Sequence, residues 1–392
     1  MGNLKRRVPQ LMTLCIWMTL LTGCWDRVET NDMAFVLTSS VDLEEDGKYR
    51  VAYLFPLPGS MGGATGGGGG TGGGKSYYID AETGTTIREA SSKLQKRMSR
   101  KMLLSHRRTI VIGEKLAKAG IHNLFDAVPR TPDSRLTCYL IVTKGNGYEL
   151  LNAEPKFERF PAEVIRELTK SRQSIPTTTK DIGIALSFNS DPIMTYLEKA
   201  ESQSAKKPSQ EIQLAGYGQF KGTQMVGIYK NQEANGLLWL RNNVKEHTLT
   251  FPMDNGKVMS ILVTGGRSSI QPQVSGDQVT FQVTLDAFGI VREDNSGQDL
   301  NESKTLHKVE RKFAEQIKKS IQATVKQMQK EDTDSAQLGL LVWRKYPYAW
   351  KHGLEENWPK IFKKAEFRIS VETSIVETGL INQNIVKEAM HQ

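Results

Sequence analysis

The most regular stretch of the chain, residues 303–330, reads SKTLHKVERKFAEQIKKSIQATVKQMQK. Large apolar side chains recur there every three or four residues and, at 100° per residue, fall within roughly 160° of one another. They are Leu306, Val309, Phe313, Ile317, Ile321, Val325 and Met328. This spacing predicts one amphipathic helix, about 42 Å long at 1.5 Å per residue. Because large apolar side chains do not stay exposed on a soluble surface, we expect the stripe to pack on a sheet.

The opposite face of this helix is basic. Residues 303–330 hold eight Lys and Arg against two Glu, a net charge of +6 in one segment. We take four of these residues as a candidate interaction face: Lys308, Lys312, Lys319 and Lys326. A solvated outer face is the simpler interpretation. The functional alternative is contact with anionic lipid headgroups or with an acidic partner surface.

The rest of the chain alternates β-type runs with short helical patterns. The runs at 258–263, 279–291 and 365–376 flank the long helix, and an apolar run surrounds Cys138. Thr86, followed by Glu89, begins a helix with a capping box. This alternation predicts an α+β fold with mixed or antiparallel sheets flanked by helices. We divide the mature chain into three domains, at residues 24–152, 153–250 and 251–392.

A glycine-rich insert interrupts the first predicted domain. Residues 59–74 include 11 glycines, an excess confined to this stretch. The segment from Gly69 to Ser76 also matches the phosphate-loop pattern G-x-x-x-x-G-K-[ST]. A true phosphate loop leads into a helix, whereas Lys75 and Ser76 lead into the β-type run Tyr77-Tyr78-Ile79. We therefore interpret the match as a by-product of the glycine tract, which we expect to be a dispensable linker.

The first 23 residues have the features of an export signal. A basic segment, residues 5–7, precedes an apolar run of 11 residues, which is too short to span a bilayer. The run ends in Leu21-Thr22-Gly23-Cys24, which resembles a bacterial lipobox, so we predict lipidation of Cys24. Cleavage before Cys24 removes three basic residues and lowers the net charge from +9 to +6. Only Cys138 then keeps a free thiol, and an internal disulfide is impossible.

The sequence contains no constellation typical of an enzyme or a metalloprotein. There is no G-x-S-x-G motif, and no two of the six histidines lie within five residues of each other. His106 is better explained as a structural residue than as a catalyst. We expect no cofactor and no metal. We expect no nucleic-acid partner, because the chain is predicted to be exported and carries no motif that reads nucleic acid.

The segment Cys24-Trp25-Asp26-Arg27-Val28-Glu29 resembles the Cys-Trp-Asp-x-x-Glu start of the C-subunit lipoproteins of bacterial spore germinant receptors, the Ger(x)C family. Further similarities follow in the family's order over nearly the whole mature chain. They are Glu89-Ala90, Leu94-Gln95, Ser99-Arg100, His106, Ile112-Gly113-Glu114, residues 117–121, Arg130, Gly227-Ile228-Tyr229, residues 236–240, Tyr346-Pro347, Trp350-Lys351 and Trp358. The glycine tract, Thr30-Asn31 and residues 145–147 depart from the family's pattern.

This resemblance implies a non-catalytic, lipid-anchored subunit on the outer face of the cell membrane, which is the spore inner membrane. It would assemble with the receptor's A and B membrane subunits in nutrient-triggered germination; no motif shows whether it touches the germinant. An alternative is a lipid-anchored solute-binding protein that works with a transporter, which needs two similar lobes. A lipid-anchored enzyme is a third possibility, disfavoured by the missing nucleophile and metal ligands.

Overall fold

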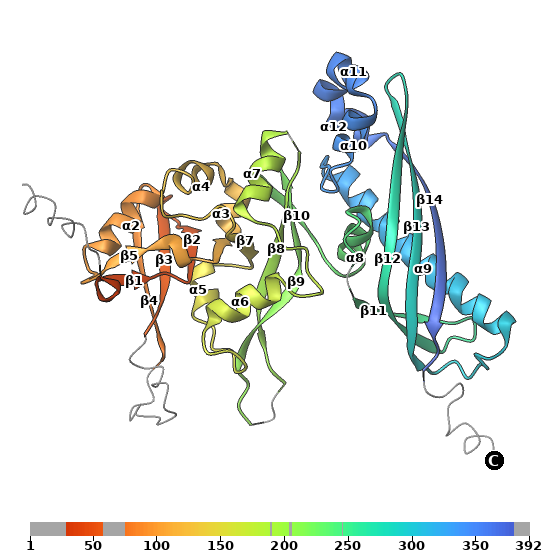
Figure 1. The fold of residues 1–392 in the computed structure, drawn as a ribbon, viewed down its shortest axis with the longest axis horizontal. Helices are drawn as coiled ribbons and strands as arrows, with labels where there is room; N and C mark the ends of the chain where they lie inside the picture. The colour runs from red at the N-terminus through yellow and green to blue at the C-terminus, as the bar shows by residue number, and fades with distance from the viewer. Residues whose placement is uncertain (1–28, 58–74, 189, 204–205, 245, 380–392) are drawn as a thin grey trace, which may run out of the picture.

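A computed structural model describes residues 29–57, 75–188, 190–203, 206–244 and 246–379. Figure 1 shows an N-terminal body built on an eight-stranded mixed sheet and a C-terminal body built on a four-stranded sheet with one long helix. The predicted α+β class is confirmed. The signal segment, Cys24 and the glycine tract at 59–74 lie outside the described residues.

The eight-stranded sheet has the order β10-β9-β8-β7-β6-β2-β3-β4. The strands β2, β6, β7 and β8 at its centre pair in parallel, and the outer neighbours pair antiparallel. The bounds are β2 (Thr38–Leu43), β3 (Tyr49–Pro56), β4 (Tyr77–Gly84), β6 (Thr109–Gly113), β7 (Tyr139–Thr143), β8 (Ile193–Glu201), β9 (Gln210–Lys221) and β10 (Gln224–Tyr229). A separate two-stranded parallel sheet joins β1 (Met33–Phe35) to β5 (Lys101–Leu103).

Helices cover both faces of this sheet, because its central strands are apolar on both sides. On β6, Ile110 and Ile112 belong to one buried cluster, whereas Val111 belongs to the other. The first face is covered by α2 (Ile87–Gln95), α3 (Glu114–Ala119), α4 (His122–Ala127) and α7 (Thr179–Ser187). The second face is covered by α5 (Gly147–Leu151) and α6 (Pro161–Thr169). Half of the predicted capping box of α2 forms, since Thr86 accepts a hydrogen bond from the Glu89 backbone N–H at 3.0 Å. The Glu89 carboxylate accepts instead from the Thr85 N–H at 2.7 Å, one residue before the N-cap.

The predicted boundary after residue 152 falls inside this body. Strand β7 lies before it and β8 after it, yet the two pair in parallel from Ile141 to Thr143. The strands of the first two predicted domains therefore share one sheet, and the division into three domains stays a prediction.

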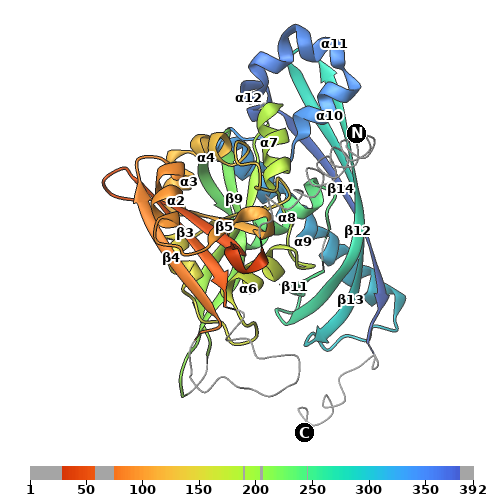
Figure 2. The same ribbon diagram turned by 60° about the vertical axis from the view of Figure 1, so that its left-hand side comes forward.

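The C-terminal body confirms the predicted long helix. Helix α9 spans Ser303–Lys330, and six residues of the apolar stripe are buried; the seventh, Leu306, is half-buried. Their side chains join one cluster with the sheet β11-β12-β13-β14 and with α8 (Asn231–Leu240). The strand bounds are β11 (His247–Pro252), β12 (Val258–Ser275), β13 (Gln278–Asp294) and β14 (Glu366–Glu377). Figures 1 and 2 show α9 running across this sheet.

A cap of short helices follows α9. It consists of α10 (Leu338–Lys345), α11 (Pro347–Ala349), the π-turn η4 (Trp350–Leu354) and α12 (Glu355–Lys363). The 3₁₀ turns η1 (Thr30–Asp32) and η3 (Leu104–His106) complete the described elements.

Helices α8 and α9 approach each other closely at Gly236. A methyl group there would lie 2.2 Å from the Ser320 carbonyl oxygen and from Thr324 Oγ1. We expect Gly236→Ala to lower the free energy of unfolding by about 1–3 kcal/mol, the usual cost of overpacking. Gly183 in α7 is a matched control, because a methyl there would meet its nearest neighbour at 3.7 Å. Gly183→Ala should be neutral or slightly stabilising in denaturant titration, and equal losses in both variants would contradict the close contact.

Candidate functional sites

The basic face of α9 is only partly free. Lys308 and Lys312 are half-buried, and both bind the carboxylate of Asp254 at 3.0 Å. Their hydrogen bonds lower the pKa of Asp254. Lys319 and Lys326 are exposed and form no ion pair within the described part of the chain. Of the four residues selected from the sequence, two therefore hold α9 to the loop before β12, and two remain available to a partner.

The phosphate-loop pattern leads into a strand. Strand β4 begins at Tyr77, directly after Lys75 and Ser76. The Lys75 ammonium binds Glu154 at 2.8 Å and lies over the ring of Tyr77. The lysine of the pattern is thus engaged by the N-terminal body, as expected for a match produced by a glycine tract.

Cys138 is buried just before β7, and its thiol donates to the Arg107 carbonyl oxygen at 2.8 Å. Burial raises the pKa of this thiol, so it is a poor nucleophile.

His106 is exposed and contacts Phe35 edge to face, with ring centroids 5.0 Å apart. Among the described residues, no group of three or more His, Cys, Asp and Glu is arranged to hold a metal ion. No described helix is long and apolar enough to cross a membrane.

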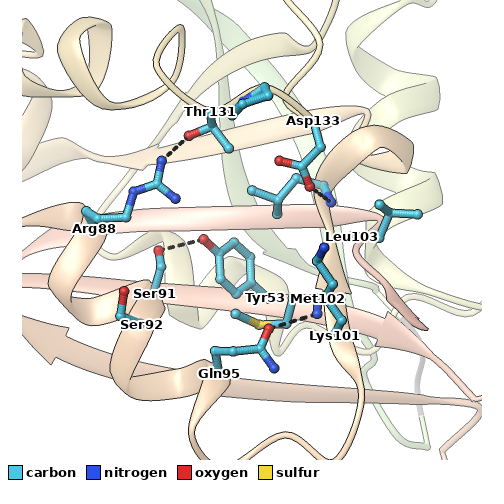
Figure 3. Close-up of a pocket in the computed structure, with 12 residues that line it drawn as sticks. Tyr53, Arg88, Ser91, Ser92, Gln95, Lys101, Met102, Leu103, Thr131 and Asp133 are labelled. Atoms are coloured by element: carbon cyan, nitrogen blue, oxygen red, sulfur yellow. Dashed lines mark hydrogen bonds between the residues drawn. The ribbon is translucent and has the colours of Figure 1, made fainter. Parts of the chain in front are cut away.

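A pocket of about 430 Å³ lies between α2, β5 and the turn at residues 131–133. We call it the α2–β5 pocket. Its walls are fixed by hydrogen bonds drawn in Figure 3: Gln95 Oε1 accepts from the Met102 N–H at 2.9 Å, and Asp133 accepts from the Leu104 N–H at 3.0 Å. Because these bonds tie α2 and the turn to the β5–η3 segment, the pocket is a fixed feature of the fold.

The α2–β5 pocket carries two cationic side chains. Arg88 donates to Thr131 Oγ1 at 2.5 Å through one nitrogen of its guanidinium group, and Lys101 forms no ion pair among the described residues. Between them lies Tyr53, whose hydroxyl is 2.7 Å from Ser91 Oγ (Figure 3). The pocket therefore offers positive charge above a partly apolar floor.

A polar network joins the two bodies where the edge of the large sheet meets the end of α9. Gln327 Nε2 donates to Gln219 Oε1 at 2.8 Å and to the Ile228 carbonyl oxygen at 3.1 Å. Gln219 Nε2 in turn donates to Thr333 Oγ1 at 2.7 Å. Asp191 accepts from the Asp334 backbone N–H at 2.7 Å. These buried and partly buried bonds link segments 99 to 143 residues apart and fix the bodies to each other.

A second pocket, of about 500 Å³, opens beside this network, and we call it the junction pocket. Its inner wall is Asp334, which accepts from the Leu338 and Gly339 N–H groups at 2.7 and 2.6 Å and from the Trp358 indole at 3.1 Å. Burial raises the pKa of Asp334 to about 7, and nearby Asp191 adds to the effect. A methyl on Gly339 would lie 2.9 Å from Trp358. The Asp334 carboxylate therefore joins the start of α10 to Trp358 of α12, and the missing side chain of Gly339 lets the two helices pack closely.

The sequence did not reveal either pocket. The α2–β5 pocket gathers residues from 53, 88–104 and 131–133, and the junction pocket gathers residues from 188–362. A few lining residues of each pocket belong to the family resemblance: Gln95 in the α2–β5 pocket, and Trp350 and Trp358 in the junction pocket. The resemblance gave no indication that these residues line cavities.

Comparisons with known proteins cover nearly the whole chain. One family profile, described as spore germination protein N-terminal domain, matches residues 26–199. A second, described as spore germination B3/GerAC like, C-terminal, matches residues 215–379. The protein YfkR of Bacillus subtilis (strain 168) is 33% identical over 377 residues, which cover 95% of this chain and 97% of YfkR. Spore germination protein KC of the same organism is 25% identical, with 93% and 94% covered.

A solved structure has the same overall fold. The crystal structure of the GerBC protein matches with a TM-score of 0.56 and 16% identity, over 86% of this chain and 96% of that one. The two family profiles together cover residues 26–199 and 215–379, and the relatives cover nearly the whole chain. The chain therefore belongs to the spore germination protein family of GerAC-like germinant receptor subunits.

Proposed function

We propose that this chain is a non-catalytic C subunit of a germinant receptor, anchored by lipid on Cys24 to the outer face of the membrane that becomes the spore inner membrane. The observation that carries the proposal is the match to the family along almost the entire chain, including 95% coverage by a 33% identical relative. In this proposal the subunit binds the receptor's A and B membrane subunits.

The main alternative, a solute-binding protein with two similar lobes, has little support. The N-terminal body has an eight-stranded mixed sheet with helices on both faces, whereas the C-terminal body has a four-stranded sheet of different order and direction. A ligand that binds between two lobes also requires them to move. Here the buried bonds of Gln219, Gln327 and Asp191 hold the bodies together.

The test is co-purification of the A and B subunits with the tagged protein from sporulating cells. Recovery of both supports the receptor proposal. A thermal-shift screen with amino acids and sugars examines the alternative, since strong stabilisation by one ligand without recovery of the subunits would favour a solute-binding protein.

We further propose that the free part of the α9 basic face, which consists of Lys319, Lys326 and their exposed neighbour Lys318, contacts an acidic surface of these subunits. Reversing three exposed charges, Lys318→Glu, Lys319→Glu and Lys326→Glu, should lower recovery of the membrane subunits by roughly tenfold or more, because like charges at an interface repel. Lys308 and Lys312 are left unchanged, since both hold Asp254.

The matched control reverses three exposed lysines elsewhere, Lys206, Lys207 and Lys257, with the same change in net charge. We expect that variant to recover the subunits normally, and both proteins to keep the wild-type melting temperature. Normal recovery with the α9 variant would leave this face as a solvated surface only.

A further inference from the structure

The segment that forms one side of the α2–β5 pocket is strongly basic. Residues 93–108 hold seven Lys and Arg and no Asp or Glu. Three of these cations already have a role within the fold. Lys93 and Arg97 pair with carboxylates, and Arg107 is buried. The other four are exposed and form no ion pair with any residue that the structure describes: Lys96, Arg100, Lys101 and Arg108.

This segment lies beside the start of the folded chain. Strand β1 pairs in parallel with β5, which places Met33 opposite Lys101. Only five residues lie between Cys24 and Thr30, where η1 begins. Whatever its conformation, a chain of that length spans no more than about 20 Å. Figure 1 shows α2, β1 and β5 together at one end of the molecule, whereas α9 lies in the other body. An acyl group on Cys24 would therefore hold the α2–β5 end at the bilayer.

The α2–β5 pocket presents its cations on two walls. Figure 3 shows Arg88 on one side and Lys101 on the other, with Tyr53 between them. Arg88 uses one nitrogen for Thr131 and keeps its remaining donors. Arg and Lys donors that converge on one cavity are suited to the oxygen atoms of a phosphate group.

We propose that the α2–β5 pocket binds the phosphate of an anionic phospholipid headgroup, and that the exposed cations of residues 93–108 lie against the same bilayer. The proposal rests on the proposed anchoring at Cys24, which brings the pocket to the membrane. The acyl chains supply attachment, and the pocket fixes which face of the protein is turned to the lipid. This orientation leaves the C-terminal body, with the basic face of α9, directed toward protein partners.

One carboxylate also lines the pocket, and it limits where the phosphate can lie. Asp133 accepts the Leu104 N–H at 3.0 Å on the wall formed by the turn. Its negative charge would repel a phosphate there, so the phosphate is confined to the space between Arg88 and Lys101. Two acidic residues, Glu29 and Asp32, precede β1 where the described chain begins. Neither of them lines the pocket.

The experiment measures binding of the unacylated chain, residues 25–392, to vesicles by sedimentation at physiological salt. This chain keeps every helix and strand of the structure. We expect it to bind vesicles of phosphatidylglycerol and phosphatidylcholine and not vesicles of phosphatidylcholine alone. Replacing both pocket cations, Arg88→Gln and Lys101→Gln, should lower the partition coefficient roughly thirtyfold, since each basic residue at an anionic surface contributes about fivefold.

The matched control removes the same charge from α9, with Lys318→Gln and Lys319→Gln. We expect its partition coefficient to stay within about twofold of the wild type, because α9 is turned away from the lipid in this proposal. Circular dichroism should not change in either variant, since all four side chains are exposed. The melting temperature should fall only slightly in the pocket variant, which loses the bond from Arg88 to Thr131. Equal losses in the two variants would show that net charge alone governs binding to the vesicles, and would contradict binding of a lipid phosphate by the α2–β5 pocket.

A final measurement, with inorganic phosphate, distinguishes a lipid phosphate from a free phosphate as the ligand of the pocket. Inorganic phosphate that stabilises the wild type but not the pocket variant, combined with no binding to anionic vesicles, would assign the pocket to a soluble ligand and reject the lipid. None of these measurements uses Cys24. Failure of acylation, measured by labelling of the full chain, is therefore distinguishable from failure of the pocket.

Discussion

Replacing Phe313 with alanine is expected to lower the free energy of unfolding by about 3–5 kcal/mol, the cost typical of removing a fully buried aromatic ring. Phe313 is 0% exposed and lies at the middle of the α9 stripe. Its ring packs onto Gly289 of β13, where a methyl group would already come within 3.0 Å of it. Because the cavity is bounded by a helix and a sheet, its walls have little freedom to collapse.

The measurement is a guanidinium titration of the unacylated chain. Phe157 is a matched control, because it is also a phenylalanine but is 98% exposed. Phe157→Ala should change the free energy of unfolding by no more than about 0.5 kcal/mol, as for most surface substitutions. Comparable losses in the two variants would mean that the C-terminal body is not held together by the α9 stripe.

Helix α9 was predicted with its full bounds because its signal is local and long. The apolar period runs from Leu306 to Met328 and admits one interpretation, and the ends of the helix, Ser303 and Lys330, lie within three residues of that stretch. Strands β12 and β13 were predicted too short. β12 continues to Ser275 through Gly265, Gly266 and Pro272, which break any apolar alternation. Pairing with β13 in the tertiary structure, rather than propensity, extends the strand.

The missed helices have weaker signals. Helix α7 has nine residues, and α10 to α12 are short, with Pro359 inside α12 and a π-turn between α11 and α12. Strand β8 was missed because only its first five residues are buried, so its pattern changes along its length. Each of these elements depends on packing that a window of neighbouring residues does not contain.

The candidate sites depended still more on tertiary structure. Lys308 and Lys312 look like free surface charges in the sequence, and only the fold brings Asp254 to 3.0 Å from both. The contacts of Asp42 also could not be predicted from the sequence. It is 1% exposed and accepts the Gly147 and Tyr148 N–H groups at 2.6 and 2.9 Å, across more than 100 residues. The lipidation predicted at Cys24 differs in this respect, since the pattern on which that prediction rests is entirely local.

Replacing Cys24 with alanine is expected to abolish acyl labelling and to leave an unprocessed or mislocalised precursor. Stable attachment to a bilayer takes two signals, such as two acyl chains, since a single myristoyl chain binds only marginally and each buried CH₂ contributes about 0.8 kcal/mol. Loss of the thiol removes every acyl chain at once. The measurements are metabolic labelling with a fatty-acid analogue and separation of membrane and soluble fractions. Cys138→Ala is the control, and its labelling should match the wild type because that thiol is buried.

Salt then separates the anchor from the basic surface. If the α2–β5 pocket and residues 93–108 bind lipid, the unacylated chain, residues 25–392, keeps a weak membrane association that depends on charge. At about 1 M salt the Debye length falls to about 3 Å, so this residual association should be washed away. The acylated wild type should stay bound in the same wash, because burial of apolar chains is not screened by salt. Labelling and salt-resistant binding that persist in Cys24→Ala would contradict anchoring at this cysteine, and would require another attachment within the chain.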